Sequence, residues 1–341
     1  MTIEVFSNLD TIPEEIAAGL SLAAGLPFFE SIEWFRCLAR HGLDAGTPRL
    51  YVSKDNDDLQ SALFCLAKGR QLSSLTNFYT IEYGPVMRGA DAMTGLRDIA
   101  SYIAGERPRW NTIDLRNLHE TELASLDTVL SASGFATHRW EQHKNWFLDV
   151  GEQSFEQYFE TLSSQLRNTI ERKSRKAERE HELRLAVYPG DGLTLDEATR
   201  HYQQVYAASW KQPEPFTEFM PALLKMSDEH NLCRVGLAWV DGEPAAAQIW
   251  LDDGDPVFIY KLAYDRKFAE LSIGSLLSKK MFQNAIDVDR VLKIDYGVGD
   301  EPYKHDWMSD CQALSGLMAC NRSTARGLLT HLRESLSARK P

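Results

Sequence analysis

The sequence predicts an α/β protein of two domains, each a mixed β-sheet with helices packed against it. Its 341 residues are about the length of two ordinary domains. Hydrophobic residues make up 43% and charged residues 25% of the chain, a balance typical of globular proteins. One order of strands and helices occurs twice along the chain. We therefore expect one domain over residues 1–150 and a second over residues 151–341.

Composition and terminal sequence exclude several classes of protein. The net charge of −12 disfavours non-specific binding to nucleic acid. No apolar run approaches the roughly 20 residues that span a bilayer, and the N-terminus lacks the pattern of a signal peptide. We therefore expect a cytoplasmic protein without membrane insertion. The five cysteines form no C-x-x-C pair and the nine histidines do not cluster, so we expect neither a disulfide framework nor a metal site.

Apolar periodicity and turn residues predict the elements of the first half in order. The polar residues Lys54–Asp58 form the turn of a hairpin, and Gly134 suits the left-handed stop of a helix. The expected strands are Thr2–Phe6, Leu50–Ser53, Leu59–Ala67 and Asn111–Leu115, with a looser β-like stretch at Gln71–Met87 and an extended aromatic segment at His138–Val150. The expected helices are Pro13–Ala24, Ser31–His41, Ala92–Ala104 and Leu123–Ser133.

The second half begins with a long charged helix and then follows a similar order. Asp241-Gly242 is typical of a hairpin turn, and Ser323 is a suitable cap for a final helix. The expected strands are Leu183–Tyr188, Cys233–Val240, Pro244–Leu251, Pro256–Tyr264, Val291–Tyr296 and Cys311–Cys320. The expected helices are Phe155–Glu180, Leu195–Ser209, Phe219–Glu229, Ser275–Ile286 and the final helix, whose apolar stripe is Ala325, Leu328, Leu329, Leu332 and Leu336.

A weak internal duplication relates the two halves. A strand–polar turn–strand unit occurs at Leu50–Ala67 and again at Val235–Leu251. A helix followed by a strand ending in Ile-Asp occurs at Ala92–Asp114 and again at Ser275–Asp295. Residue identity between the halves is low, so the relation depends on element order. Two related α/β units are the simpler interpretation, and chance similarity is the alternative.

The start of the helix near Gly274 is a candidate site for phosphate. A glycine lets the backbone approach a ligand closely. The free N–H groups and the dipole of a helix start attract anions. Ser272, Ile273, Gly274 and Ser275 are therefore the candidate residues for binding a pyrophosphate. The alternative is a plain turn that precedes a helix.

The segment after the strand Val291–Tyr296 contains the candidate catalytic residues. Ligands of open α/β sheets gather beyond the C-terminal ends of strands, where Asp295 lies. Its carboxylate is either a base for an attacking amine or a support for the turn at Gly297. Tyr303 is a candidate for protonating a leaving thiolate. Lys304 is a candidate for binding phosphate or an oxyanion, against the alternative of a solvated lysine.

Two further features have both a functional and a structural interpretation. Trp210 and Lys211 follow a helix and are candidates for lining a substrate pocket, although core packing is an alternative for the tryptophan. The helix segment Leu166–Glu180 is rich in arginine and lysine. It is either an anion-binding edge, for a polyphosphate or tRNA, or a solvated face with i,i+4 ion pairs.

The second half resembles the GNAT-type acyltransferase domain of CelD-like proteins, which are associated with cellulose and exopolysaccharide biosynthesis. The resemblance covers roughly Phe155–Met318, and the first half more loosely resembles the companion GNAT-like domain. The tandem arrangement is similar to that of Fem-type aminoacyl-transferases. The matching pieces are the basic helix, Ser209-Trp210, Gly242-Glu243-Pro244-Ala245-Ala246, Tyr260 with Ala263-Tyr264-Asp265, Ser272-Ile273-Gly274-Ser275-Leu276-Leu277, and Asp295-Tyr296-Gly297-Val298-Gly299 followed by Tyr303-Lys304 and Trp307.

This resemblance implies splayed central strands, an acyl donor between them, and direct transfer to an amine without a covalent intermediate. By position, Ser272–Ser275 match the loop that holds the donor's phosphates, and Lys304 matches a lysine that contacts the reacting group. Tyr260 joins Trp210 and Lys211 as an expected substrate-binding residue. The usual GNAT loop is R/Q-x-x-G-x-G/A, and only Gly274 is clear here.

The predicted function is therefore N-acyl transfer from acyl-CoA, as a co-substrate, to an amine acceptor, with no tightly bound cofactor. Two alternatives remain open. One is a Fem-like transferase that uses aminoacyl-tRNA, and the other is a non-catalytic accessory protein of exopolysaccharide biosynthesis.

Overall fold

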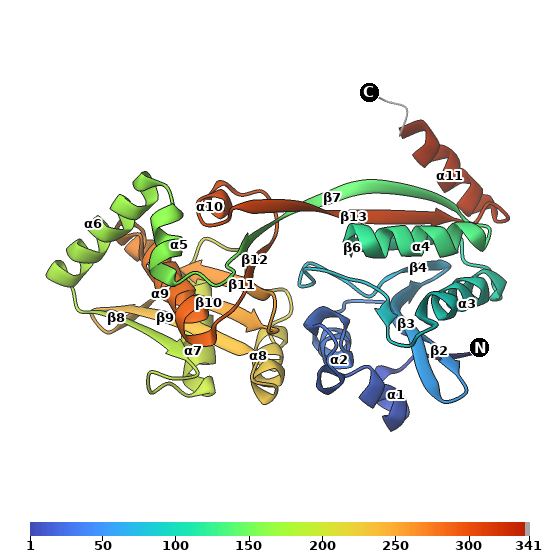
Figure 1. Ribbon diagram of the computed structural model, residues 1–341, viewed down its shortest axis with the longest axis horizontal. Helices are drawn as coiled ribbons and strands as arrows, with labels where there is room; N and C mark the ends of the chain where they lie inside the picture. The colour runs from blue at the N-terminus through green and yellow to red at the C-terminus, as the bar shows by residue number, and fades with distance from the viewer. Residues whose placement is uncertain (338–341) are drawn as a thin grey trace. The chain divides into compact units, whose positions relative to one another are not determined.

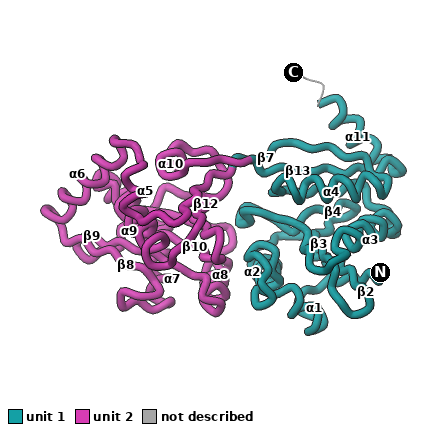
Figure 2. The backbone as a smooth tube through the Cα atoms, in the orientation of Figure 1, with its two compact units in different colours: residues 1–144, 313–341 teal, residues 145–312 magenta. Residues whose placement is uncertain are grey.

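The computed structural model describes residues 1–337 and divides the chain into two compact units. Unit 2 is residues 145–312, and unit 1 consists of residues 1–144 together with the chain from Ala313 onward (Figure 2). The chain enters unit 2 along β7 (Ala136–Asp149) and leaves it along β13 (Asp310–Cys320). The boundary expected at residue 150 lies close to this crossing. The placement of the C-terminal segment differs, because Ser315–Cys320 of β13 pair with β6 of unit 1.

Unit 1 contains a mixed sheet in which β4 and β6 pair in parallel, whereas the pairs β1–β2, β2–β3, β3–β4 and β6–β13 are antiparallel. Ser31 caps α2 by accepting a hydrogen bond from Trp34 N, at 3.2 Å, and the rings of Trp34 and Phe35 are buried. The strands are β1 (Thr2–Phe6), β2 (Thr47–Asp55), β3 (Asp58–Lys68), β4 (Gln71–Ser74), β5 (Val86–Met87) and β6 (Thr112–Leu118). The α-helices are α1 (Glu14–Gly19), α2 (Ile32–His41), α3 (Ala92–Gly105), α4 (Glu120–Ala132) and α11 (Ala325–Ser337).

The strands of unit 2 form a mixed sheet in the order β12-β11-β10-β9-β8. Its neighbours pair antiparallel except β11 and β12, which are parallel. The strands are β8 (Leu183–Tyr188), β9 (Cys233–Val240), β10 (Glu243–Asp252), β11 (Val257–Tyr264) and β12 (Lys293–Val298). The helices are α5 (Phe155–Thr161), α6 (Ser164–Glu180), α7 (Leu195–Ala208), α8 (Phe219–Glu229), α9 (Ile273–Gln283) and α10 (Pro302–His305).

Helices α9 and α7 cover opposite faces of the unit 2 sheet. A Cβ atom built on Gly236 of β9 points at Met281 and Leu277 of α9. The Trp239 ring of the same strand meets His201 of α7 edge-on, with ring centroids 5.4 Å apart. Residues three apart on a strand point to opposite faces. The sheet is therefore buried on both sides, as the apolar runs of β9 and β10 require.

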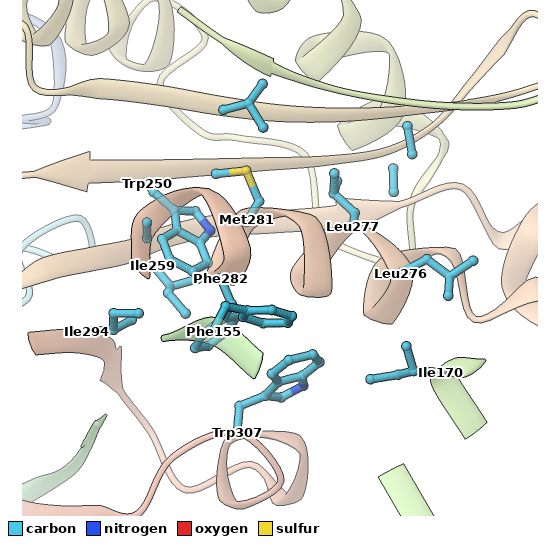
Figure 3. Close-up of a cluster of buried hydrophobic side chains, with 14 of the residues drawn as sticks. Phe155, Ile170, Trp250, Ile259, Leu276, Leu277, Met281, Phe282, Ile294 and Trp307 are labelled. Atoms are coloured by element: carbon cyan, nitrogen blue, oxygen red, sulfur yellow. The ribbon is translucent and has the colours of Figure 1, made fainter. Parts of the chain in front are cut away.

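The core on the α9 face is centred on Phe282 (Figure 3). Its ring stacks on Trp307, with centroids 4.8 Å apart, and meets Trp250 of β10 edge-on at 5.1 Å. Tyr158 of α5 stacks on the same ring, and its hydroxyl donates a hydrogen bond to the carbonyl oxygen of Trp307, at 2.7 Å. Aromatic pairs in these geometries add to the free energy of burial. This packing fixes α9 and the segment after β12 against the sheet.

The two units share the element order that the sequence predicts. In each, a hairpin (β2–β3 or β9–β10) is followed by a third strand, a helix and a parallel strand: β4-α3-β6 in unit 1 and β11-α9-β12 in unit 2. Both crossover helices are visible in Figure 1. The sequence-based duplication is therefore present as repeated topology.

Several predicted elements differ in extent. The long helix expected over Phe155–Glu180 is two helices, because Leu162 is extended (ψ 155°) and Ser163 starts α6 by accepting a hydrogen bond from Leu166 N. The β-like stretch Gln71–Met87 is strand only at its ends. The hydroxyl at the start of α11 is that of Thr324, which accepts from Gly327 N at 3.1 Å, and not that of Ser323.

Candidate functional site

The central strands of unit 2 diverge at the place where the sequence predicts an active site. β11 and β12 pair only at their starts, Val257 with Ile294 and Phe258 with Asp295. Their C-terminal halves separate, so the polar backbone groups of each half no longer face the other strand. An opening between parallel strands gives a ligand access to the middle of the sheet.

A cavity of about 430 Å³ lies against the separated ends of the strands. Its walls are the end of β11, the first turns of α9 and the segment from β12 to Trp307, together with Gln248 of β10 and Trp210. Its volume is within the range of sites for small molecules and cofactors. Its lining is Trp210, Gln248, Leu262, Ala263, Tyr264, Ala269, Ser272, Ile273, Gly274, Ser275, Ser278, Tyr296, Tyr303 and Trp307.

All four predicted phosphate-binding residues line this cavity. Ser272 has a left-handed backbone (φ 53°, ψ 38°), and its carbonyl oxygen accepts hydrogen bonds from Ser275 N and Leu276 N. The chain therefore turns sharply into α9. Ser275 N and Leu276 N are already bonded, whereas the N–H groups of Ile273 and Gly274 have no acceptor within the helix. Gly274 allows a close approach, because a Cβ atom there would lie 3.3 Å from the Tyr264 ring. Backbone N–H groups at such a helix start favour an anionic group in the cavity.

A buried hydrogen-bonded chain forms one wall of the cavity. Gln248 of β10 is 3% exposed, and its Nε2 donates to Ser278 Oγ at 2.8 Å and to the Gly274 carbonyl oxygen at 3.3 Å. Its Oε1 accepts from Trp250 Nε1 at 2.9 Å, so the orientation of the amide is fixed. The Ser278 hydroxyl also hydrogen-bonds Tyr296, whose pKa is raised, mainly by burial. These bonds tie the start of α9 to β10 and β12.

Three residues of this hydrogen-bonded chain, Gln248, Ser278 and Tyr296, were not among the candidate site residues predicted from the sequence. Gln248 is a single amide in the otherwise apolar run Ala245–Leu251, and a buried amide in such a run needs hydrogen-bond partners. That contrast was the only signal in the sequence. Ser278 and Tyr296 lie on amphipathic elements, where a polar side chain is ordinary.

Asp295 is 2% exposed and does not line the cavity. Its Oδ1 accepts a hydrogen bond from Gly297 N, and its Oδ2 accepts one from Asn145 Nδ2, both at 2.6 Å. Gly297 has φ 68°, and the register of β12 with β7 shifts between Asp295 and Val298, so the strand carries a β-bulge here. Of the two interpretations that the sequence left open for Asp295, this geometry is that of the turn support.

Lys304 is 4% exposed and also lies outside the cavity lining. Its Nζ donates to the carbonyl oxygens of Gly297, at 3.2 Å, and Val298, at 2.5 Å, and lies 3.3 Å from Glu301 Oε2. Burial lowers the pKa of Lys304, and the charge of Glu301 opposes that shift. Lys304 therefore holds the end of the β-bulge, opposite the contact made by Asp295.

Tyr303 is the predicted catalytic residue that faces the cavity. Its ring meets that of Tyr296 edge-on, with centroids 5.6 Å apart. Burial and the neighbouring Glu301 carboxylate raise its pKa to about 12. The hydroxyl is therefore protonated at neutral pH and can act as a general acid. Lys304 and Asp295 fix the segment that carries it.

The predicted substrate residues are separated by the fold. Trp210 lines the cavity beside β11, and its ring packs on that of Tyr264 with centroids 4.5 Å apart. Lys211 lines a second cavity of about 330 Å³ between α7 and the segment that follows it. Tyr260 lies on β11 and is absent from both linings.

The basic helix α6 carries ion pairs on its own surface. Arg175 pairs with Glu171, at 3.0 Å, and Lys176 with Glu180, at 3.6 Å, both at i,i+4 spacing. Lys173 donates to the carbonyl oxygen of Glu270. These contacts are those of a solvated helix face that packs on the segment before α9. These contacts neutralise part of the positive charge of α6, which would otherwise be available to bind an anion.

Within residues 1–337, no group of three or more histidine, cysteine, aspartate or glutamate side chains is placed to hold a metal ion. Across that same part of the chain, every helix is too short or too polar to cross a membrane.

Residues 164–305 match the sequence model of a family described as "Acetyltransferase (GNAT) domain". No curated protein matches the sequence. The matched segment contains α6 to α10, and so it contains the diverging strands and most of the cavity lining. The match covers most of unit 2, which is therefore similar to a GNAT acetyltransferase domain.

Solved structures resemble the whole chain in fold. FemX is similar with a TM-score of 0.61 at 9% identity, covering 98% of this chain and 100% of that chain. The C-terminal domain of a putative lysylphosphatidylglycerol synthetase from Agrobacterium fabrum is similar with a TM-score of 0.59 at 11% identity, covering 94% and 95%. A tandem GNAT protein from the clavulanic acid biosynthesis pathway has a TM-score of 0.52 at 11% identity, covering 94% and 99%. The chain therefore has a tandem GNAT-like fold.

Proposed function

We propose that this protein is an N-acyltransferase that moves an acyl group from acyl-CoA to an amine by direct attack. The observation that carries the proposal is the cavity between the diverging ends of β11 and β12, with the first turn of α9 in its wall. The free N–H groups there suit the pyrophosphate of CoA, and the apolar ends of the strands suit its pantetheine arm. The donor is a substrate, and no tightly bound cofactor is proposed.

The reaction forms one C–N bond and breaks one C–S bond. The neutral amine attacks the thioester carbonyl and gives a tetrahedral intermediate, whose collapse expels the thiolate of CoA. The attacking nitrogen loses its proton to water, and the thiolate takes one from the acid that faces it. Direct transfer requires both substrates to be held at once, so positioning and charge stabilisation supply most of the rate enhancement.

Tyr303 is the proposed acid, because it lines the cavity and its raised pKa keeps it protonated. After proton transfer, solvent restores the phenol. Asp295 and Lys304 are proposed as positioning residues, because their side chains bond to the backbone of the β-bulge. Ser272–Ser275 are proposed to receive the phosphates.

A matched pair of substitutions at Ser275 tests the donor site. Ser275→Asp places a negative charge in the first turn of α9, where it favours the helix through the macrodipole but repels phosphate. Ser275→Asn has nearly the same shape without the charge. At about 5 Å and an effective dielectric constant of about 20, like charges repel by about 3 kcal/mol. We expect calorimetry to show CoA binding weakened at least about tenfold by Asp and nearly unchanged by Asn.

Equal effects of the two substitutions would count against phosphate binding at this turn. If neither CoA nor acetyl-CoA binds the unmodified protein, the acyl-CoA proposal fails. In that case the Fem-like alternative is tested by retention of aminoacyl-tRNA on a filter. Its support is the tandem fold and the basic side chains of α6, some of which the local ion pairs leave unmatched.

The resemblance of the second half to CelD-like proteins supports a role in the synthesis of cell-envelope polysaccharide or its precursors. This role is compatible with catalysis and also with a non-catalytic accessory protein. Binding of acetyl-CoA together with loss of turnover in Tyr303→Phe would argue for the enzyme. Absence of both donor binding and turnover would argue for the accessory protein.

A further inference from the structure

The second cavity of unit 2 lies beside the proposed donor site. Its volume is about 330 Å³, and it is lined by α7, the segment after α7 and the start of α8. Consecutive residues join the two cavities, since Trp210 lines the first and Lys211 the second. β11 joins them as well, because Tyr264 lines the first cavity while Lys261 bonds to Glu214 in the wall of the second.

The charges in this second cavity do not balance. Glu214 is matched, since its Oε1 lies 3.2 Å from Lys261 Nζ and its carboxylate also bonds to the Tyr206 hydroxyl. Both members of the ion pair are largely buried, at 12% and 16% exposure. Lys211 is the additional cation. Among the ion pairs of residues 1–337 there is none for Lys211, and the centroid of the Trp210 ring is 5.8 Å from its Nζ.

A partly buried cation without a counter-ion is unfavourable in the free protein. Burial lowers the pKa of Lys211 to about 8, and the positive charge of Lys261 adds to this effect. Glu214 and Glu301 oppose the shift without cancelling it. A ligand that brings a negative charge into the cavity would restore the balance and would gain a charge-assisted hydrogen bond.

We propose that this cavity is the acceptor site and that Lys211 binds a carboxylate of the acceptor. The acceptor is then a small amine that also carries a carboxylate, such as an amino acid. This inference rests on the proposed function, because it assigns the second substrate of the same transfer.

The chemistry of the lining supports a carboxylate over a phosphate group. One unmatched lysine neutralises one negative charge, whereas a phosphate monoester carries nearly two. Tyr202, Tyr206 and Met220 supply aromatic and apolar surface for the hydrocarbon part of an amino acid. The volume lies at the small end of the range for ligand sites, which suits a molecule of this size.

The test measures acceptor binding without any donor, by calorimetry or ligand-observed NMR. The probes are a panel of aliphatic and aromatic amino acids, the amide of each, and O-phosphoethanolamine. We expect at least one amino acid to bind and its amide to bind at least about tenfold more weakly. Lys211→Met should weaken the amino acid to the level of its amide, and Lys211→Arg should restore most of the binding.

The proposal is overturned if the amide binds as well as the acid, if no amino acid in the panel binds, or if O-phosphoethanolamine binds more tightly than every amino acid. It is also overturned if Lys211→Met binds normally. If Lys211→Met does not fold, as judged by circular dichroism, the acid-to-amide ratio of the unmodified protein still decides. Lys68→Met, the same change at an exposed lysine of unit 1, is the control, and it should bind amino acids normally.

This design separates the two proposals. Amino acid binding without CoA binding refutes the acyl-CoA donor but leaves the acceptor site in place. CoA binding together with equal affinity for amino acids and their amides refutes the acceptor site but leaves the acyl-CoA donor in place.

Discussion

Substitution of Asp295 separates its two interpretations, that of a base and that of a turn support. Asp295→Ala removes the acceptor for Gly297 N and for Asn145 Nδ2, both in the interior. An orphaned buried donor costs about 1–3 kcal/mol, so the two together predict a loss of about 2–6 kcal/mol of unfolding free energy. A loss of that size is a large part of the stability of a typical domain.

Asp295→Asn should be much milder. Its amide oxygen still accepts from Gly297 N, and its new NH₂ group faces Asn145. Asn145 can reverse its amide and present Oδ1, which is buried and has no hydrogen-bond partner at present. The exchange of charge-assisted for neutral hydrogen bonds predicts a loss of about 1–2 kcal/mol.

The exchanged variant, Asn145→Asp with Asp295→Asn, is the matched control. It keeps one carboxylate and one amide in contact, so it should be more stable than Asn145→Asp alone, which sets two carboxylates side by side. Urea unfolding followed by tryptophan fluorescence measures the stability. The kcat with acetyl-CoA and an active acceptor measures the function, and Asp295→Asn should lower it by less than about tenfold. A loss of about 10³-fold in kcat by Asp295→Asn, with unchanged stability, would refute the turn-support interpretation and restore the base.

Three further outcomes follow from the site. Lys304→Met leaves one buried and one partly buried carbonyl oxygen without their donor, so we expect about 2–3 kcal/mol lower stability by urea unfolding with CoA affinity unchanged; a stable variant that loses CoA binding would contradict this. Tyr303→Phe should lower kcat about 10²-fold with little change in KM, and retention of kcat would exclude Tyr303 as the acid. Binding of an N-acetylated amino acid, which has no titrating amine, should be constant between about pH 5, where its carboxylate is ionised, and about pH 7. Above pH 8 it should weaken about tenfold per pH unit as the Lys211 ammonium deprotonates. Glu214, Lys261, Glu301 and Lys304 surround that ammonium, and Lys211→Arg should flatten the profile; a profile that stays sloped in that variant would assign the titration to one of these neighbours.

Apolar periodicity and turn residues determined the element order of both units and the fold class. The strand Leu183–Tyr188 and the helix Phe219–Glu229 have the predicted bounds, because each depends on a local pattern of buried side chains. The helix start at Ser272–Ser275 was also predicted locally, and the four residues do line one cavity. The sequence also allowed the interpretation that Asp295 supports a turn, because aspartate commonly accepts a hydrogen bond from a nearby backbone N–H.

Only the tertiary structure decided which of these residues share a site. Trp210 and Lys211 are neighbours in an irregular segment, and no periodicity tells which cavity each side chain enters. Gln248 belongs to the donor cavity because β10 lies beside β11, a pairing that hydrogen bonds between distant segments create. β13 likewise returns the chain to unit 1 because its partner is β6, almost 200 residues earlier in the sequence. Sequence patterns report which face of an element is buried, whereas pairing and packing between distant segments decide what that face meets.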